Sequence, residues 1–454
     1  MALTKELAGF VGSLRFGDVP PAALPFIRSA FTDCFATLVA GRVSEPARIL
    51  RETLDPPPGE SRLFVDQGTA RAPEAAWLNA TAAHALDFDD AAQKGHLSAV
   101  LVPAILAEAD ACDADGRAMA TAYAAGYETW AELLRREPGL YHNHSWHPTG
   151  VFGPLAAAAA CASLRGLDAR HTAHALGMAA SRSGGVIANF GSMTKPLHAG
   201  IAAHAGVMAA RLAQRGFTAS PDALEGSKGL MRGISPEGRV DVDSPVLAGR
   251  DWKLPRDGVN IKKYPVCFAT HRALDGILDI LAEQVVPAGD VKRIAVTISR
   301  RNKSTLRFDA PQDRLQAKFS MQFAMASAIV AHRCGLQELD DALVQRADVR
   351  ELMRAVEVIP TDEEAGDRAG EAPVDVVQLQ LQDGRTLRRE VDYVRGGPER
   401  PLLPGELFAK FESCLQAGGL AADARPLFNA LMAVDELPGT RALYALAESR
   451  EIHP

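Results

Sequence analysis

The sequence has 454 residues, of which 47% are hydrophobic and 23% are charged. This composition is typical of a globular protein, and the length suffices for two or three domains of ordinary size. The 49 lysines and arginines stand against 56 aspartates and glutamates, which gives a formal net charge of −7. A mildly acidic chain argues against nucleic-acid binding as the main function.

The six cysteines are scattered along the chain, and no two of them form a C-x-x-C motif. This scatter indicates reduced thiols, so we expect a cytoplasmic protein. We expect no signal peptide and no membrane span, because no stretch of ~20 residues is apolar without polar interruption. We also expect no nucleotide cofactor, since the sequence has neither a P-loop nor a G-x-G-x-x-G motif after a strand.

Apolar residues recur at helical spacing through roughly the first 265 residues. The predicted helices cover residues 3–14, 22–41, 73–86, 98–111, 116–134, 151–164, 173–180 and 197–214. Alanine and glycine dominate residues 155–162 and 199–210, so these two helices can pack closely inside a larger helical body. A short strand is expected at residues 62–65. This part of the chain predicts an all-helical domain.

The pattern changes near residue 290. Residues 291–299 alternate as a strand does, and two further strands, 374–381 and 386–391, flank a turn around Gly384. Helices are expected at 273–285, 320–334, 407–415 and 422–437. We therefore predict a mainly α fold. Residues 1–271 and 396–454 would form a large all-helical domain built from both chain ends, and residues 272–395 an inserted, smaller α+β domain.

Three aspartates and two histidines lie within residues 84–98. Asp87 and Asp90 are three positions apart, so a helix would place both on one face. Carboxylates held so close push one another's pKa values apart, as acid–base sites require. The alternative interpretation is a helix end that frays into a solvated acidic loop.

A second dense segment brings His142, His144 and His147 within six residues. Imidazoles can bind zinc, but no H-E-x-x-H motif or cysteine partner accompanies them. Acid–base or binding roles are therefore favoured over a metal site.

Lys195 lies at the start of the small-residue helix predicted at 197–214. Thr194 can cap this helix, and its N-terminus favours anions through its unpaired N–H groups and its dipole. His198 lies near the same face. The pattern predicts a carboxylate or phosphate site beside a titratable base, with a solvated helix start as the alternative. Lys263, Cys267 and His271 precede a later helix, where a buried, inert thiol is the commoner outcome.

Several of these stretches together resemble the MmgE/PrpD family, which includes 2-methylcitrate dehydratase, cis-aconitate decarboxylase and iminodisuccinate epimerase. The motifs follow the family's order: Leu86-Asp87-Phe88-Asp89-Asp90 with His96, Gly126-Tyr127-Glu128, Trp146-His147-Pro148-Thr149, Met193-Thr194-Lys195-Pro196 with His198, Tyr264-Pro265-Val266-Cys267 with His271, and Ala317-Lys318-Phe319-Ser320. The sequence departs from the family's usual pattern at Ala91, where threonine is frequent, and at Leu97, where proline is frequent.

The resemblance implies that the α+β domain is a lid and that the active site lies between the two domains. It also implies a homodimer without a metal or organic cofactor. The catalytic positions it implies are Asp87, His96, His147, Lys195 and His271. To substrate binding we assign Asp90, Thr194, His198 and Lys263.

The implied reaction is proton abstraction next to a carboxylate of a small di- or tricarboxylate. Lys195 would hold a carboxylate, the histidines would share proton transfer, and Asp87 would orient one of them. A 2-methylcitrate dehydratase-like lyase ranks first. An iminodisuccinate epimerase-like isomerase ranks second, because residues 189–196 resemble the epimerase branch of the family more closely. A cis-aconitate decarboxylase-like lyase is a third outcome. A non-catalytic polycarboxylate binder and, more weakly, a metal-dependent hydrolase are the alternatives from other classes.

Overall fold

The computed structural model describes residues 2–66, 68–137, 139, 141–366, 370–420 and 422–448. The chain forms two compact units. Unit 1 comprises Met1–Ala188, Thr194–Ile261 and Leu403–Pro454, and unit 2 comprises Asn189–Met193 and Lys262–Leu402. The expected domain boundaries, and the role of the smaller domain as a lid, stay predictions.

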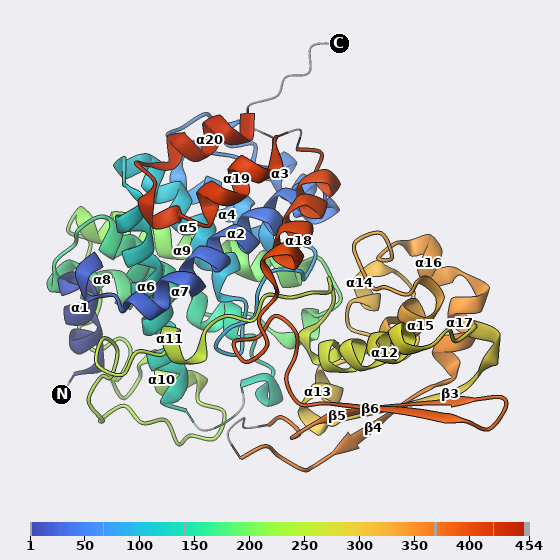
Figure 1. Cartoon of the computed structure of the whole chain (residues 1–454). Helices are drawn as coiled ribbons and strands as arrows, with labels where there is room; N and C mark the ends of the chain where they lie inside the picture. The colour runs from blue at the N-terminus through green and yellow to red at the C-terminus, as the bar shows by residue number, and fades with distance from the viewer. Residues whose placement is uncertain are drawn as a thin grey trace, which may run out of the picture. The chain divides into compact units, whose positions relative to one another are not determined.

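Unit 1 is helical apart from a two-stranded ribbon, β1 (Ser61–Arg62) with β2 (Thr69–Ala70), as far as its described residues go. The expected strand at residues 62–65 is thus reduced to the start of this ribbon. The longer helices are α1 (Leu3–Ser13), α2 (Leu24–Gly41), α3 (Glu45–Leu54), α4 (Ala72–His84), α5 (Leu97–Cys112), α6 (Gly116–Arg135), α7 (Pro148–Leu164), α8 (Ala169–Ala180), α9 (Thr194–Gln214), α18 (Pro404–Ala417), α19 (Ala424–Leu431) and α20 (Thr440–Glu448). Two short helices are α10 (Leu230–Ile234) and α11 (Leu254–Asp257). Helix α18, from the C-terminal part of the chain, packs against α2, so both chain ends build this unit (Figure 1).

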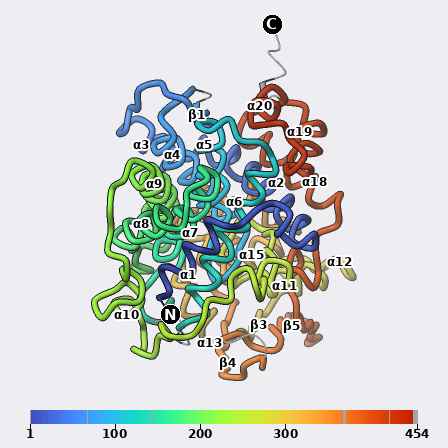
Figure 2. Tube along the Cα trace, turned by 90° about the vertical axis from the view of Figure 1, so that its left-hand side faces the viewer, coloured from blue at the N-terminus to red at the C-terminus, as the bar shows by residue number. Residues whose placement is uncertain are grey.

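Helix α7 lies inside unit 1, where it packs against α5, α6, α8 and α9 (Figure 2). Its residues from Pro148 to Ala162 are all buried, as a helix that is apolar on every side requires. Small residues allow the close approach of neighbouring backbones. A Cβ atom on Gly206 of α9 would lie 2.3 Å from the Cβ of Ala157, and one on Gly200 would lie 2.1 Å from Thr81 Oγ1 of α4. Glycine therefore lets α9 approach both α7 and α4.

Among the described residues, Pro21–Gly41 is the one span long and apolar enough to cross a membrane by length and composition, although the sequence analysis expected none. Core helices pass the same test, and 67% of this span is buried inside the protein. The finding is therefore weak evidence for a membrane span.

Unit 2 contains a mixed sheet in the order β4-β3-β5-β6. Its strands are β3 (Val291–Ser299), β4 (Val356–Thr361), β5 (Asp375–Leu381) and β6 (Thr386–Val391). The β3–β4 pair is parallel, and the β3–β5 and β5–β6 pairs are antiparallel. The helices are α12 (His271–Glu283), α13 (Arg300–Thr305), α14 (Arg314–Ala317), α15 (Met321–Ala331), α16 (Asp341–Gln345) and α17 (Ala347–Arg354). Helix α12 packs against β5, β6 and α15.

The prediction of a mainly α fold is confirmed, and most expected helices and the three expected strands of unit 2 match within a few residues. The sequence analysis missed the edge strand β4. This strand contains Pro360 and has several exposed positions, and both features weaken the strand pattern. Strand β4 runs parallel to β3. The paired residues extend from Ile294 opposite Val356 to Ser299 opposite Thr361.

Candidate active site

Residues 85–96, here called the aspartate loop, connect α4 to α5. The expectation that Asp87 and Asp90 share a helical face is wrong, because α4 ends at His84. Asp87 then adopts a left-handed conformation with a φ of 52°, which aspartate tolerates better than most residues but which breaks the helical spacing. The solvated-loop alternative is wrong as well, since Asp87 is 3% exposed and Asp89 and Asp90 are fully buried.

The aspartate loop is tied to distant parts of unit 1. Ala91 and Asn260 exchange two backbone hydrogen bonds of 2.9 Å. Lys410 of α18 donates to the carbonyl oxygen of Phe88 at 2.8 Å and lies 4.0 Å from the centre of the Phe88 ring. At the end of the loop, the backbone N–H of His96 donates to Thr149 Oγ1 at 3.1 Å. These bonds hold the loop in one buried conformation.

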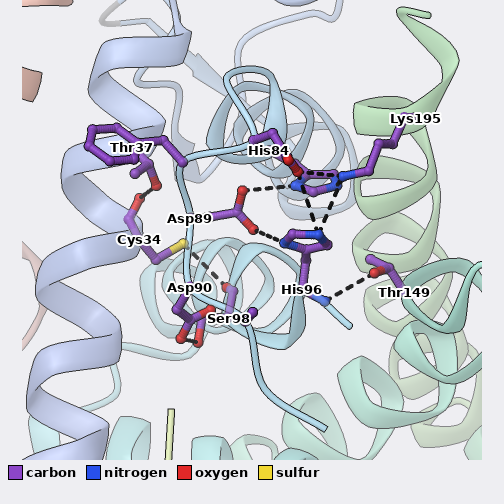
Figure 3. A network of polar contacts seen from close by, with 12 residues as sticks. Cys34, Thr37, His84, Asp89, Asp90, His96, Ser98, Thr149 and Lys195 are labelled. Atoms are coloured by element: carbon purple, nitrogen blue, oxygen red, sulfur yellow. Dashed lines mark hydrogen bonds and ion pairs between the residues drawn. The ribbon is translucent and has the colours of Figure 1, made fainter. Parts of the chain in front are cut away.

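Lys195 lies in the first turn of α9 and points its ammonium group into this loop. Its Nζ atom is 2.6 Å from Asp87 Oδ1, 2.7 Å from His84 Nε2 and 3.3 Å from His96 Nε2. An ammonium group has three N–H donors and no acceptor, so it can serve these three acceptors. Figure 3 shows Lys195 reaching across to the two imidazole rings from the neighbouring helix.

Asp89 lies behind the two imidazole rings. Its Oδ1 is 2.8 Å from His84 Nδ1, and its Oδ2 is 2.9 Å from His96 Nδ1 (Figure 3). Burial disfavours the charge of Asp89, but both histidines counteract it, and together they hold the pKa of the carboxyl well below its usual value. Burial lowers the pKa of His84, which keeps that ring neutral near pH 7.

Asp90 faces away from this group. It accepts a hydrogen bond from Ser98, whose hydroxyl also contacts Tyr123 Oη at 2.8 Å. Burial raises the pKa of Asp90 well above its usual value, and the nearby carboxylates Asp33 and Asp89 add to this shift. The expected separation of pKa values thus occurs between the adjacent residues Asp89 and Asp90.

His147 precedes α7, and its Nδ1 lies 3.0 Å from Nδ1 of His198. A single proton can lie between these two nitrogens, so at least one ring is neutral. Burial and the charge of Lys195 lower the pKa of His147 well below its usual value, and the same two causes lower the pKa of His198 to about 4. Both rings are therefore neutral near pH 7.

Unit 1 thus brings together Asp87, His96, His147, Lys195 and His198. Thr194 is the first residue of α9, so it belongs to the helix that it was expected to cap. Lys263 and His271 belong to unit 2, where His271 Nε2 lies 3.2 Å from the carbonyl oxygen of Val266. No finding tests the catalytic and substrate-binding roles assigned to these residues, so those roles stay predictions.

The possible metal ligands among the described residues are not the three histidines first considered. His142 and His144 lie in a short 3-10 helix, and His144 is exposed. The groups with suitable spacing are His84, His96 and His147, and His84 with Asp87, Asp89 and His96. Lys195 Nζ contacts members of both groups, so a lysine cation already lies among these atoms.

Sequence reasoning missed His84 and Asp89. Both lie in the dense segment 84–98, but the assumed helix directed attention to Asp87 and Asp90. The signal was present in the spacing, because His84 and His96 flank Asp89 at five and seven residues. That the Asp89 carboxylate contacts both rings becomes evident only from the folded loop, which turns at Asp87.

Residues 5–243 match the MmgE/PrpD N-terminal domain, and residues 264–427 match the MmgE/PrpD C-terminal domain. The chain belongs to the MmgE/PrpD family. The resemblance found in the sequence motifs is therefore confirmed across nearly the whole chain.

Curated relatives of this MmgE/PrpD protein are cis-aconitate decarboxylases. The human enzyme is 28% identical over 354 residues, which cover 75% of this chain and 72% of the relative. The mouse enzyme is 28% identical over 355 residues, covering 75% and 71%. The Aspergillus terreus enzyme is 24% identical over 451 residues, covering 93% and 91%. Family and relatives together identify the protein as an enzyme of the lyase type.

Proposed function

We propose that the protein is a lyase for a small tricarboxylate, with decarboxylation of a cis-aconitate-like substrate as the first candidate reaction. The names of the relatives support this choice over the dehydratase ranked first from the sequence. The observation that carries the proposal is the buried Lys195 ammonium group, which contacts one carboxylate and two imidazole nitrogens. Such a group can both hold a substrate carboxylate and deliver a proton.

In the proposed decarboxylation, the bond between carbon and one substrate carboxylate breaks, and CO₂ leaves. The electron pair passes into the neighbouring double bond and carboxylate, where positive charge stabilises it. A proton from Lys195 Nζ then adds to carbon, and solvent reprotonates the lysine. The contact of 3.3 Å to His96 is the longest of the three, so it is the one that a substrate oxygen would replace.

A second candidate reaction is dehydration of a 2-methylcitrate-like substrate. One observation favours it. The Nε2 atom of His96 faces a hydrogen-bond donor, so it is an acceptor and can act as a base. Dehydration needs such a base for the proton next to a carboxylate, with Lys195 as the acid for the departing hydroxyl. Decarboxylation needs only the acid.

Incubation with cis-aconitate, 2-methylcitrate, citrate and iminodisuccinate in D₂O, followed by proton NMR, tests the proposal. We expect cis-aconitate to lose one carboxylate as CO₂ and its product to gain one deuterium. An alkene formed from 2-methylcitrate would establish dehydration instead. Deuterium entering beside a carboxylate without loss of water or CO₂ would indicate the epimerase. No change in any of the four would contradict the proposal.

We further propose that unit 2 contributes His271 to catalysis and Lys263 to substrate binding, that the protein is a homodimer, and that it works in the cytoplasm without a cofactor. Substitution of His271 or Lys263 by alanine, light scattering of the purified protein, and cell fractionation test these points in turn. Full turnover by both variants would contradict the first point.

A further inference from the structure

We propose that Asp89 is a positioning residue. Through its two oxygens it holds His84 and His96 in one tautomer, so that both Nε2 atoms accept hydrogen bonds from Lys195. The inference deepens the proposed function, because it defines the proton state in which the site meets its substrate. None of the roles assigned from the sequence involves Asp89 or His84.

The carboxylate of Asp89 fixes the proton positions on the near side of both rings. Each oxygen of Asp89 contacts one ring nitrogen, at 2.8 Å for His84 and 2.9 Å for His96. The carboxyl side chain is fully buried, so water does not compete for these bonds. An ionised carboxylate only accepts hydrogen bonds, and therefore both Nδ1 atoms carry their protons.

On the opposite side of the two rings, the Nε2 atoms face Lys195. A neutral imidazole with a proton on Nδ1 has a lone pair on Nε2. The two Nε2 atoms lie 2.7 and 3.3 Å from Lys195 Nζ, which can only donate. Donor and acceptor roles thus agree on both sides of the His84 ring. At His96 the lysine is the nearer partner of Nε2, and Asp87 Oδ1 lies farther away, at 3.5 Å. The reversed tautomer would direct an N–H group at the ammonium group and leave a lone pair facing the carboxylate.

The neighbouring aspartate supports the choice of Asp89. Asp90 is equally buried, but it bonds to Ser98 and faces neither imidazole ring in Figure 3. The centres of the two rings are 4.1 Å apart, which is close enough for the single carboxylate of Asp89 to contact both. The loop thus separates an aspartate with a lowered pKa, which orients the histidines, from one with a raised pKa.

The two histidines have different roles in this arrangement. The His84 side chain is fully buried, whereas the His96 side chain is 13% exposed. His84 therefore anchors the lysine, and His96 is the ring that a substrate can reach. If His96 takes a proton from substrate carbon at Nε2, the new imidazolium still donates through Nδ1 to Asp89, and the positive charge is balanced there.

Asp89 has several other charged or titratable neighbours, and any test by pH must include them. They come from the loop, from the three helices α2, α9 and α18, and from the residue before α7: Asp87, Asp90, Asp33, Cys34, Lys410, Lys195, His198 and His147. A comparison of variants at Asp89 leaves all of these groups in place, so differences in a pH profile report on Asp89 itself.

The first experiment needs no substrate. Nitrogen-15 NMR of the full-length protein with labelled histidine distinguishes protonated from unprotonated ring nitrogens, and His84→Gln and His96→Gln assign the two signals. We expect both rings to carry the proton on Nδ1. In Asp89→Asn, the amide can accept from one ring only and must donate to the other, so one ring should change tautomer. A wild-type protein with Nε2 protonated in either ring would overturn the proposal.

The second experiment measures kcat and KM against pH for wild type, Asp89→Asn and Asp89→Glu. For Asp89→Asn we expect kcat to fall at least about 10- to 100-fold, the loss typical of partners that orient metal-bound histidines, with little change in KM. The acidic limb of the profile should move to lower pH, because the imidazolium loses a neighbouring negative charge. Asp89→Glu should restore the limb and part of kcat. If kcat fell equally in Asp89→Asn and Asp89→Glu and the pH profile did not move in either variant, the role of Asp89 would be structural only, and the proposal would be contradicted.

Asp168→Asn is the matched control. Asp168 Oδ1 lies 2.8 Å from His171 Nδ1 at the start of α8, so the pair has the same chemistry on the surface. This variant should leave turnover and the signals of His84 and His96 unchanged. If Asp89→Asn does not fold, the NMR spectrum of the wild type and the pH profile of Asp89→Glu still test the proposal. If no substrate is turned over, the proposed function fails. The tautomers of His84 and His96 can still be determined by NMR, because that experiment needs no substrate.

Discussion

Lys195 Nζ lies 2.6 Å from Asp87 Oδ1, and each side chain is only 5% exposed. Burial makes the charge of each partner costly without the other. The same ammonium group also contacts two imidazole rings, so a single lysine organises the charges of the site. The first two predictions concern this lysine.

Replacing Lys195 by alanine should lower kcat at least about 100-fold, because the reaction loses its acid and the group that stabilises negative charge. The NMR assay in D₂O measures this change. Lys303→Ala removes a surface lysine that pairs with Asp309 and should leave turnover unchanged. Full turnover by Lys195→Ala would show that the chemistry occurs elsewhere.

The same variant should gain affinity for zinc. Without the ammonium group, His84 Nε2, His96 Nε2 and an oxygen of Asp87 surround the vacated position, and both rings are already oriented through Nδ1 by Asp89. Two imidazoles and a carboxylate form a common zinc ligand set. Calorimetric titration with zinc chloride checks this, with wild type as the reference. Lys195→Ala/His84→Gln should lose the gain, and equal affinity in all three proteins would contradict the prediction.

Stability should depend on pH through His198. In the folded protein its pKa is about 4, whereas an unfolded histidine has a pKa of about 6.5. As pH falls from about 6.5 to about 4, only the unfolded chain binds this proton, so the free energy of unfolding decreases. The decrease should be up to about 1.4 kcal/mol per pH unit steeper in wild type than in His198→Gln.

Urea unfolding at several pH values in this window measures both slopes. Asp90 acts in the opposite direction, because its raised pKa means that the folded protein binds a proton that the unfolded chain releases. This effect is common to both proteins and cancels in the comparison. Identical slopes would show that His198 does not stay neutral in the folded protein.

Lys410→Met should destabilise unit 1 by about 3–5 kcal/mol, the usual cost of removing one partner of a buried ion pair. Lys410 Nζ lies 2.5 Å from Asp33 Oδ1, and the two side chains are 5% and 0% exposed. The double variant Lys410→Met/Asp33→Asn should recover much of this loss, because the uncompensated carboxylate is gone. The urea midpoints of the three proteins provide the test. A double variant no more stable than Lys410→Met would contradict the ion-pair explanation.

Gly200→Ala should cost about 1–3 kcal/mol, because the added methyl group would overlap Thr81 and Trp77 of α4 and separate two packed helices. Gly9→Ala in α1 is the matched control, since nothing lies within 4 Å of its added Cβ. The control should gain about 0.5–1 kcal/mol from helix propensity. Thermal unfolding of both variants separates the two effects, and a stable Gly200→Ala would show that α9 and α4 can move apart.

Much of the fold could be predicted from the sequence because its helices are long and its strands alternate. Periodicity located α2, α5 and β3 within a residue or two, and the turn at Gly384 placed β5 beside β6. Strand β4 could not be found in this way, since an edge strand with exposed positions and a proline lacks the alternation. Its partner β3 lies more than 50 residues earlier in the chain.

The candidate site was predicted in part. Lys195, His96 and His147 were found from their chemistry and their motifs. The role of Asp89 depends on the left-handed turn at Asp87, which a local sequence pattern does not determine. The substrate-binding role of His198 stays a prediction. The sequence did not indicate that its ring lies against His147, because the two residues are 51 positions apart.

The bond from Lys410 to Phe88 joins residues 322 positions apart. A ribosome adds about 5–20 residues per second, so the aspartate loop emerges roughly 15 to 65 seconds before the lysine that fixes it. During this interval Asp33 has not yet met its buried cation, and the whole of unit 2 is synthesised. The site therefore acquires its final form only after α18 has been synthesised, and a nascent chain that stops before α18 carries the side chains of the candidate site without the bond from Lys410.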